Sequence, residues 1–302
     1  MNTMHTLFVF DFDWTVVNCN SDEYVPAQVL GHDAASDGFR DLIRKSGTSN
    51  DEVDLDWHKC VEIMVGRAMN EGGGATPGDV LAAAARMPFL DQVKMAITEI
   101  SEKGERTGQM ILSDGNTLFI EAFLQANDME KCFDEGIMTN IGEFVTSREE
   151  EGGKPALKVT HQSAKYGGHN CPRCARSPNL CKTQALRDKL SQMEEVPAKI
   201  VYVGDGANDA CPALNVLRKC DVLLARGGIK RLEANDRSGA ETDGEAKDKR
   251  EESKSETKFG ILSALDKAKL DGEKIPKCYL SEWRTGAELR SLIGDVISSG
   301  YS

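Results

Sequence analysis

The sequence has no run of about 18 apolar residues, the length that a helix needs to cross a membrane, so a membrane-spanning protein is not expected. It also has no excess of basic residues, since 37 Lys and Arg stand against 49 Asp and Glu and give a net charge of −12. A surface this acidic repels phosphate backbones and anionic lipids. We therefore expect neither a nucleic acid nor a membrane as a partner.

The first residues lack the basic start and the apolar stretch of a secretory signal. With no such signal, the nine cysteines predict a reducing compartment, the cytoplasm, and thiols that are mostly free and buried. Apolar residues make up 40% of the 302, which suits a soluble globular protein with a substantial core.

Short apolar runs predict buried strands that alternate with helical patterns. The clearest strands are expected at 7–10, 109–112 and 199–203, and weaker ones at 136–139, 156–159 and 221–225. Strand and helix alternation predicts an α/β fold with a doubly wound parallel sheet.

Apolar residues at helical spacing fill the segment from 22 to 104 without a strand signal, at 38–45, 55–69, 78–87 and 90–100. We therefore predict a helical cap at 22–104, inserted into a core formed by 1–21 and 105–302. A further helix is expected near 282–297. Residues 233–258 are mainly charged and small, which predicts a flexible insertion within the core.

The sequence DFDWT at 11–15 follows the predicted strand 7–10. Side chains alternate along a strand, so Asp11 and Asp13 should leave its end on the same side. One carboxylate could attack phosphorus while the other handles protons. An ordinary acidic turn after a strand is the alternative.

The sequence GDGAND at 204–209 follows the predicted strand 199–203. Its carboxylates, Asp205 and Asp209, stand among glycines and suit a hard cation with oxygen ligands. A loop that caps a helix is the alternative.

Two further polar residues could bind a phosphate. Ser113, in SDGN at 113–116 after the strand ending at 112, could donate its hydroxyl to a phosphate oxygen. Lys182 could neutralise the phosphate and the developing charge. Turn and cap chemistry and a solvated surface lysine are the alternatives.

These four segments, in this order, resemble the four motifs of the haloacid dehalogenase-like hydrolases. A narrower set of segments is similar to the phosphoethanolamine/phosphocholine phosphatase family, which also contains pyridoxal-phosphate phosphatases. The segments that carry this resemblance are 10–13, 20–22, 113–117, 139–140, 169–182, 204–212 and 283–286. The resemblance implies a Rossmann-like hydrolase core with an inserted helical cap that closes over the substrate.

The resemblance also implies a mechanism. Asp11 would be the nucleophile and form an aspartyl phosphate. Asp13 would protonate the leaving alcohol and then deprotonate the attacking water. Mg²⁺ would be held by Asp11, by the main-chain carbonyl of Asp13 and by Asp205.

Other positions would bind the substrate. Ser113 and Lys182 would hold the phosphoryl group, and Asp209 would hold the metal or orient Lys182. Asp22 and Asp114 match positions that contact the amine or quaternary ammonium of the substrate, although both could instead cap helices.

The predicted function is Mg²⁺-dependent hydrolysis of a small phosphorylated metabolite, phosphoethanolamine or phosphocholine. One alternative keeps the chemistry and takes pyridoxal phosphate or pyrophosphate. Another is a catalytically inactive scaffold that binds partners through 233–258. Its signature would be a missing nucleophile or metal ligand, and none is missing.

A Cys and His segment reads H-x-C-x₂-C-x₆-C. Four such ligands at short spacing could hold a structural Zn²⁺. Buried free thiols or a disulfide are the alternatives. The residues are His169, Cys171, Cys174 and Cys181.

Overall fold

The computed structural model describes a seven-stranded sheet. The described residues are 6–47, 56–72, 74–103, 107–146, 154–169, 171, 174, 179–227, 260–272 and 276–299. Their strands are Thr6–Phe10 (β1), Thr107–Asn116 (β2), Ile137–Thr146 (β3), Pro155–Thr160 (β4), Lys199–Gly204 (β5), Val222–Arg226 (β6) and Tyr279–Trp283 (β7). The sheet order is β4-β3-β2-β1-β5-β6-β7, and every pair is parallel except the antiparallel pair β3 and β4.

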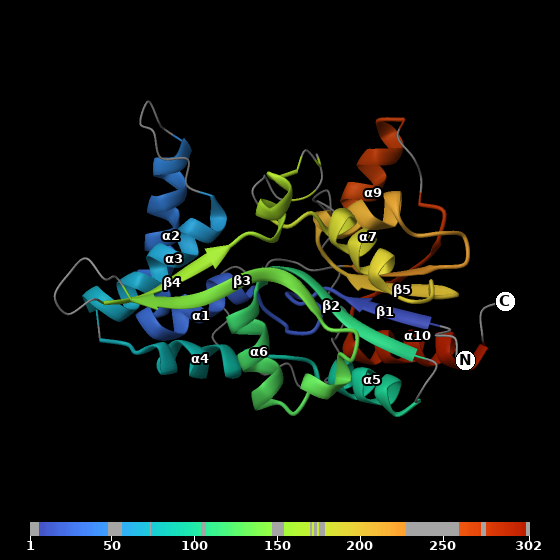
Figure 1. Cartoon of the computed structure of the whole chain (residues 1–302), viewed down its shortest axis with the longest axis horizontal. Coiled ribbons are helices and arrows are strands. Elements are labelled where there is room, and N and C mark those ends of the chain that lie inside the picture. Colours follow the sequence, from blue (N-terminus) through green and yellow to red (C-terminus); the bar gives the residue numbers. More distant parts are fainter. Residues whose placement is uncertain are drawn as a thin grey trace, which may run out of the picture.

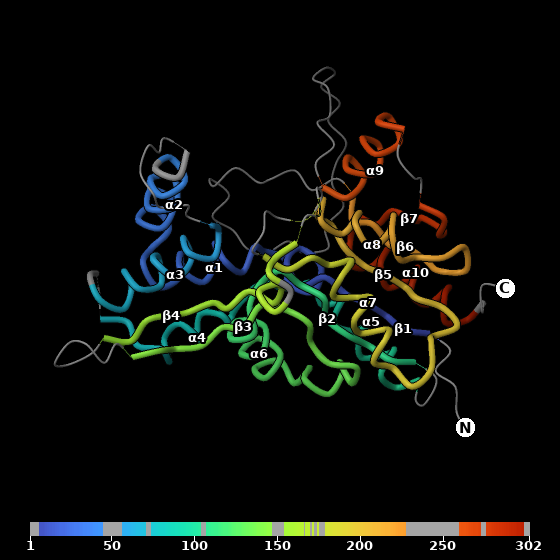
Figure 2. Tube along the Cα trace, turned by 45° about the horizontal axis from the view of Figure 1, so that its top comes forward, coloured from blue at the N-terminus to red at the C-terminus, as the bar shows by residue number. Residues whose placement is uncertain are grey.

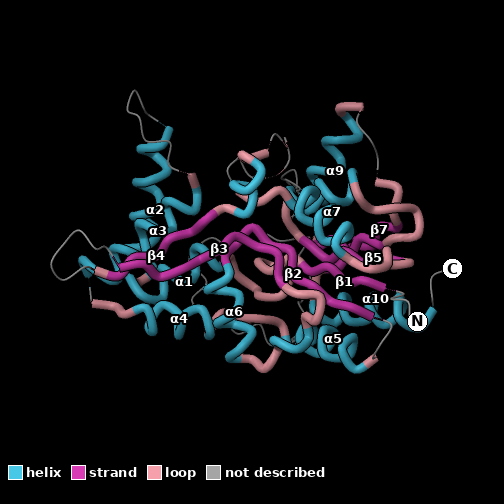
Figure 3. The backbone as a smooth tube through the Cα atoms, in the orientation of Figure 1, coloured by secondary structure: helices cyan, strands magenta, loops and turns pink. Residues whose placement is uncertain are grey.

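Helices cover both faces of this sheet, which confirms the predicted α/β class (Figure 1). The α-helices are Ser21–Leu30 (α1), His32–Gly47 (α2), Trp57–Arg67 (α3), Pro77–Ala85 (α4), Asp91–Glu102 (α5), Thr117–Ala126 (α6), Lys182–Gln192 (α7), Ala210–Asn215 (α8), Ile261–Leu270 (α9) and Gly286–Ser299 (α10). Shorter turns are Ala68–Gly72 (η1), Glu130–Cys132 (η2), Gln162–Tyr166 (η3) and Ala207–Asp209 (η4). Figure 3 separates the helices from the strands by colour. None of these described helices is long and apolar enough to span a membrane.

The central strand β1 shows why the sheet has a layer of helices on each side. Phe8 and Phe10 pack in the same core cluster as residues of α5, α6 and α10. Leu7 and Val9 point the other way and pack with residues of α7, α8 and α9. All four side chains are fully buried, so the strand is apolar throughout instead of alternating with polar residues.

Helices α1 to α4 pack on one another, and α3 also packs against β4. The antiparallel pair β3 and β4 runs out from the parallel part of the sheet toward these helices (Figure 2). In contrast, α5 packs against α10 and β2. The division into a cap at 22–104 and a core stays a prediction, and 233–258 lie outside the described residues.

The structure corrects three details of the predicted elements. Strand β2 continues through 113–116, because Asn116 still pairs with Asn140 of β3. The helix expected from 282 starts at Gly286, and the preceding residues form the edge strand β7, in which only Trp283 is buried. Strand β3 extends to Thr146, well beyond the expected 139, because the antiparallel partner β4 supplies hydrogen bonds there.

Candidate active site

The carboxyl ends of three adjacent strands bring the predicted acidic residues together. Asp11 follows β1, Asp205 follows β5, and Ser113 lies near the end of β2. Strand β1 pairs in parallel with both β2 and β5, so these three ends lie side by side. Open parallel sheets place their ligands at this edge.

Lys182 joins two of the carboxylates. Its Nζ lies 2.7 Å from Oδ2 of Asp11 and 2.7 Å from Oδ1 of Asp209. The lysine is completely buried at the first position of α7. The hydroxyl of Tyr202, from β5, donates to the same Oδ1 of Asp209 at 2.7 Å. A buried ammonium held between two carboxylates is therefore fixed beside the predicted nucleophile.

The second oxygen of Asp209 is also occupied. The main-chain N–H groups of Asp205 and Gly206 donate to Oδ2 at 3.1 and 2.8 Å. The Asp209 carboxylate presses so closely on Gly204 that a Cβ there would lie 2.5 Å from its Cγ. Both oxygens of Asp209 thus have protein partners, and its contact with Lys182 agrees with the predicted role of orienting that lysine.

Asp11, Asp205 and Asp209 bring one carboxylate oxygen each to within 4.8 Å of one another. Oδ1 of Asp11 accepts a hydrogen bond from Phe12 N at 2.7 Å. An all-oxygen donor set with more than one carboxylate fits Mg²⁺. Asp11 and Asp205 are the side chains of this group that the predicted mechanism assigns to the ion. The Asp13 carbonyl as a further ligand stays a prediction.

The electrostatics of this cluster agree with that donor set. Burial, and next the negative charge of Asp209, raise the pKa of Asp11 well above its ordinary value and the pKa of Asp205 to about 8. Burial alone would lower the pKa of Lys182, but Asp11 and Asp209 outweigh it and keep the ammonium charged. A divalent cation would offset the concentrated negative charge.

Asp13 has the properties of a proton donor. Its Oδ1 accepts a hydrogen bond from Ser21 N at 3.0 Å. Burial, and then the charge of Asp22, raise the pKa of Asp13 to about 8. The carboxyl group is therefore largely protonated at neutral pH and can act as a general acid.

Asp22 and Asp114 lie next to this centre, as predicted from the sequence. Oδ2 of Asp22, on α1, accepts a hydrogen bond from Trp57 Nε1 at 2.8 Å, and burial raises the pKa of Asp22 to about 7. Oδ2 of Asp114, on β2, accepts a hydrogen bond from Asn208 Nδ2 at 2.9 Å. Both carboxylates are thus oriented by polar groups from other segments.

His58 connects these two residues, although its sequence context gave no sign of it. Its Nε2 lies 3.8 Å from Oδ2 of Asp22 and 2.9 Å from the main-chain oxygen of Asp114. Burial lowers the pKa of His58, which keeps the ring neutral. Asn140 Nδ2 donates to the same Asp114 oxygen at 2.9 Å. Trp57 and His58 occur in a helix of ordinary amphipathic pattern, so periodicity could not separate them from core residues.

Ser113 is completely buried, and its Oγ accepts a hydrogen bond from Gly115 N at 3.1 Å. Its placement on β2, beside the end of β1, agrees with the predicted position next to Asp11. The contact of Ser113 with a phosphate stays a prediction.

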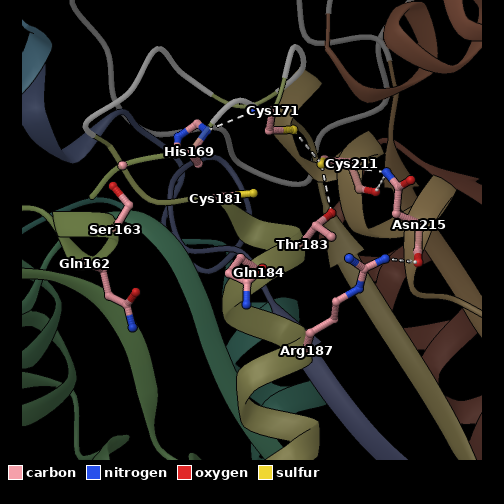
Figure 4. A pocket seen from close by; sticks show the side chains of 11 residues that line it. Gln162, Ser163, His169, Cys171, Cys181, Thr183, Gln184, Arg187, Cys211 and Asn215 are labelled. Atoms are coloured by element: carbon pink, nitrogen blue, oxygen red, sulfur yellow. Dashed lines mark hydrogen bonds between the residues drawn. The ribbon is translucent and has the colours of Figure 1, made fainter. Parts of the chain in front are cut away.

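The cysteine segment differs from its prediction in one ligand. Cys171, Cys174 and Cys181 converge, but the fourth sulfur of the cluster belongs to Cys211 on α8, and His169 is not a member (Figure 4). His169 instead accepts a hydrogen bond at Nδ1 from Cys171 N at 3.2 Å. The spacing rule missed Cys211 because it lies far along the chain, beyond strand β5.

Comparisons with known proteins extend these observations. The family described as "Putative Phosphatase" matches residues 6–242. A thiamine phosphate phosphatase-like protein of Arabidopsis thaliana is 29% identical over 223 residues, which are 73% of this chain and 80% of that protein. The pyridoxal phosphate phosphatase of Homo sapiens is 30% identical over 230 residues, 74% of this chain and 83% of its own.

The phosphoethanolamine/phosphocholine phosphatase of Homo sapiens is 28% identical over 225 residues, 74% of each chain. Among solved structures, a substrate-bound phosphoserine phosphatase covers 73% of this chain and 86% of its own, with a TM-score of 0.44 and 16% identity. Family membership rests on the sequence matches.

Proposed function

The chain belongs to this phosphatase family of the haloacid dehalogenase-like hydrolases, and we propose that it hydrolyses small phosphomonoesters through an aspartyl-phosphate intermediate on Asp11. The observation that carries the proposal is the buried group of Asp11, Lys182 and Asp209 at the carboxyl end of β1, with 2.7 Å between the ammonium and each carboxylate. This arrangement holds a carboxylate oxygen and a positive charge next to each other, as transfer of a phosphoryl group requires.

In the first step an oxygen of Asp11 attacks phosphorus, and the bond from phosphorus to the leaving oxygen breaks. Asp13 gives its proton to that oxygen, so the alcohol leaves neutral. In the second step Asp13, now ionised, takes a proton from water, and the water oxygen attacks the same phosphorus. The acyl phosphate bond then breaks, which releases phosphate and restores Asp11 and the protonated Asp13.

Three other residues stabilise the transferring group. Lys182 supplies a permanent positive charge, and Asp209 holds it in place through Oδ1, while Oδ2 of Asp209 is itself held by the main-chain N–H of Gly206. Ser113 supplies a hydroxyl donor. Mg²⁺ held by Asp11 and Asp205 would supply a second positive charge against the phosphoryl oxygens.

The substrate that we propose carries a positively charged head, as phosphoethanolamine and phosphocholine do. Asp22 and Asp114 place two carboxylates beside the catalytic centre, and the neutral ring of His58 adds no opposing charge. A cation between these groups would favour the ionised form of Asp22. Similarity to the human phosphoethanolamine/phosphocholine phosphatase supports this choice.

Pyridoxal phosphate is the second candidate, because a human relative at 30% identity bears that activity in its name. A relative in Arabidopsis thaliana, also 30% identical, is named an inorganic pyrophosphatase, and the chain covers 70% of its length. Pyrophosphate carries no cationic group, so the carboxylates of Asp22 and Asp114 would repel it.

A kinetic panel over these four compounds with Mg²⁺ tests the proposal. We expect the highest kcat/KM for phosphoethanolamine or phosphocholine. The Asp114→Asn variant should lower kcat/KM for these two by about 10- to 100-fold and leave kcat/KM for an aryl phosphate without a cationic group within about threefold. Equal losses of kcat/KM on all compounds would show that the Asp114 carboxylate does not select the head group.

The nucleophile has its own test. We expect Asp11→Asn to abolish turnover, and a variant with normal rates would make the assignment wrong. Hydrolysis retained after deletion of residues 233–258 would argue against the alternative of a catalytically inactive scaffold.

A further inference from the structure

We propose that the protein binds one structural Zn²⁺ ion through four thiolates, and that this ion ties the start of α7 to α8 behind the catalytic lysine. The ligands are Cys171, Cys174, Cys181 and Cys211. They lie outside the group of carboxylates described above, and their chemistry suits a different metal, since thiolates select zinc while Mg²⁺ selects oxygen.

The distances between the sulfur atoms match a metal site better than disulfide bonds. All four sulfurs lie within 4.8 Å of one another. A tetrahedron with Zn–S bonds of about 2.3 Å has edges of about 3.8 Å, and the Cys174 to Cys181 sulfur distance is 3.8 Å. Cys171 and Cys211 are 3.0 Å apart, still well beyond the S–S bond of about 2.05 Å in a disulfide.

The positions of the ligands along the chain are also those of a structural zinc site. Cys171 and Cys174 are separated by two residues, the short spacing with which zinc sites hold one end of the ion. Cys181 and Cys211 come from the beginnings of two different helices, α7 and α8. A site made from three segments of the chain would crosslink them as a disulfide does, without needing an oxidising compartment.

Polar groups next to the cluster favour thiolates over thiols. The Thr183 hydroxyl lies 2.8 Å from the Cys211 sulfur, and Asn215 Nδ2 lies 3.9 Å from the same atom. Cys181 occupies the N-cap of α7, and its sulfur lies 3.8 Å from the Cys174 sulfur. Such partners of the ligand atoms orient metal sites and tune their affinity.

A pocket of about 480 Å³ reaches this cluster from the surface, and Figure 4 shows Cys171, Cys181 and Cys211 on its wall. Cys174 is not among the residues that line the pocket, and it is buried. Four protein ligands leave no open position for a substrate, so the site is structural and not catalytic. The pocket does give a chelator a path to the ion.

The cluster is adjacent in sequence to the catalytic group. Cys181 directly precedes Lys182, and Cys211 follows Asp209 by two residues. Each partner of the Lys182–Asp209 ion pair therefore lies within two residues of one proposed zinc ligand. Loss of the ion should loosen this ion pair, so zinc would act on catalysis by positioning Lys182.

Metal analysis of the full chain, expressed without a metal-binding tag and purified in reductant, is the primary test. Elemental mass spectrometry should find about one zinc ion per chain in the parent protein. The Cys174→Ser and Cys211→Ser variants should each lose that zinc. Cys220→Ser, at an exposed thiol, and Asp205→Asn, at the carboxylate cluster, should keep it. Retention of zinc in both control variants would show that this site is separate from the proposed Mg²⁺ site.

A second measurement uses the unmodified chain, because a serine variant can fail to fold. Removal of zinc with a chelator should lower Tm by several degrees, and Zn²⁺ should restore it while Mg²⁺ does not. Co²⁺ in place of zinc should give the charge-transfer absorption of cobalt bound to thiolates. These readouts do not depend on phosphatase activity, so they can succeed or fail independently of the proposed function.

Two results would overturn the proposal. Protein with no zinc and four titratable thiols at these positions would show free cysteines. Disulfide bonds would instead show as a lower intact mass in the absence of reductant, because each disulfide removes two hydrogen atoms from the chain.

Discussion

The proposed phosphate end and the proposed head-group end of the site are built in different ways. Asp11 and Asp205 follow adjacent parallel strands, and Lys182 begins a helix that packs on that sheet. Asp22, in contrast, is held by a tryptophan from α3, and Asp114 by an asparagine that follows β5. The first region depends on the sheet and the second on contacts between distant segments.

Because of this difference, we expect that substitutions can alter the rate of the reaction and the choice of substrate separately. The charges at the phosphate end are paired at 2.7 Å and buried, so a change there should affect every substrate. The carboxylates at the head-group end accept hydrogen bonds from neutral donors, among them Trp57 and Asn208. A change there should affect substrates according to their charge.

Loss of Lys182 should have the largest effect of all. In Lys182→Met, the buried carboxylates of Asp11 and Asp209 lose their shared cation, so we expect kcat to fall by about 10³-fold for every substrate. Breaking the pair should also lower the free energy of unfolding by about 3 kcal/mol. Steady-state kinetics and urea unfolding measure the two effects.

Lys189→Met on the same helix is the matched control. Lys189 pairs with Glu135 at 2.8 Å and is only partly buried, so kcat should stay within about twofold. Equal losses in both variants would mean that Lys182 acts only through the stability of α7.

The Asp22→Asn variant should separate activity from stability. We expect kcat/KM for phosphocholine to fall by about 10- to 100-fold, because one carboxylate facing the cation is lost. The hydrogen bond from Trp57 can persist, since asparagine also offers an oxygen. The same change should leave kcat/KM for an aryl phosphate without a cationic group nearly unaffected.

The Asp22→Asn variant should lose activity but gain stability, and the gain in its free energy of unfolding should depend on pH. The pKa of Asp22 is raised by burial to about 7 from its ordinary 3.8, so the folded chain holds this proton more tightly than the unfolded chain. The stability from this group is complete below pH 4 and is lost as the pH rises through 7. Asp22→Asn should therefore be more stable than the parent by about 1–3 kcal/mol at pH 8, with no difference near pH 4.

Denaturant unfolding at both pH values measures this crossover. Asp33→Asn, an exposed carboxyl on α2, is the control and should show no such difference. A parent chain that is more stable than Asp22→Asn at pH 8 would contradict the assignment of a destabilising buried charge.

The Trp57→Phe variant should have a smaller, purely selective effect. Phenylalanine keeps the ring that stacks on Phe39 at 5.3 Å but removes the N–H that donates to Asp22. We expect KM for phosphocholine to rise about tenfold, as for loss of one hydrogen bond to a charged group, with kcat unchanged. A uniform fall in kcat on all substrates would place Trp57 at the phosphate end instead.

Arg226→Lys should have the smallest effect. The Arg226 guanidinium donates to the carbonyl of Trp14, which has a left-handed φ of 55°, and to Asn18 Oδ1 at 2.7 Å. Lysine cannot make both bonds, so the loop that follows Asp13 should loosen and kcat should fall about threefold to tenfold.

Arg218→Lys, at the opposite end of β6, should leave kcat unchanged in the same assay. A fall in kcat of similar size in both variants would point to general destabilisation of the strand and not to the loop.

The sequence was sufficient to predict the phosphate end, for a physical reason. Each group there follows an apolar strand within a few residues, so the strand pattern also places the side chain. Asp11, Ser113 and Asp205 could be assigned in this way, and all three lie at one edge of the sheet. Lys182 was found through the family resemblance, because a lone lysine before a helix carries no signal of its own.

The head-group end and the cysteine cluster were predicted only in part. Trp57 and His58 reach Asp22 and Asp114 through packing of α3, and no short-range pattern shows that. Cys211 joins the cluster only because β5 and α8 return beside α7. Contacts between remote segments are set by the whole fold, so a spacing rule selected His169 in its place.

Rapid quenching of the first turnover with labelled phosphocholine and Mg²⁺ tests the central claim, that Asp11 becomes phosphorylated. The account predicts an acid-stable, alkali-labile phosphoryl group on the peptide that contains residue 11, formed and lost at rates that account for kcat, and absent from Asp11→Asn. Turnover with no phosphoryl protein at any time, or a label on another residue, would contradict it.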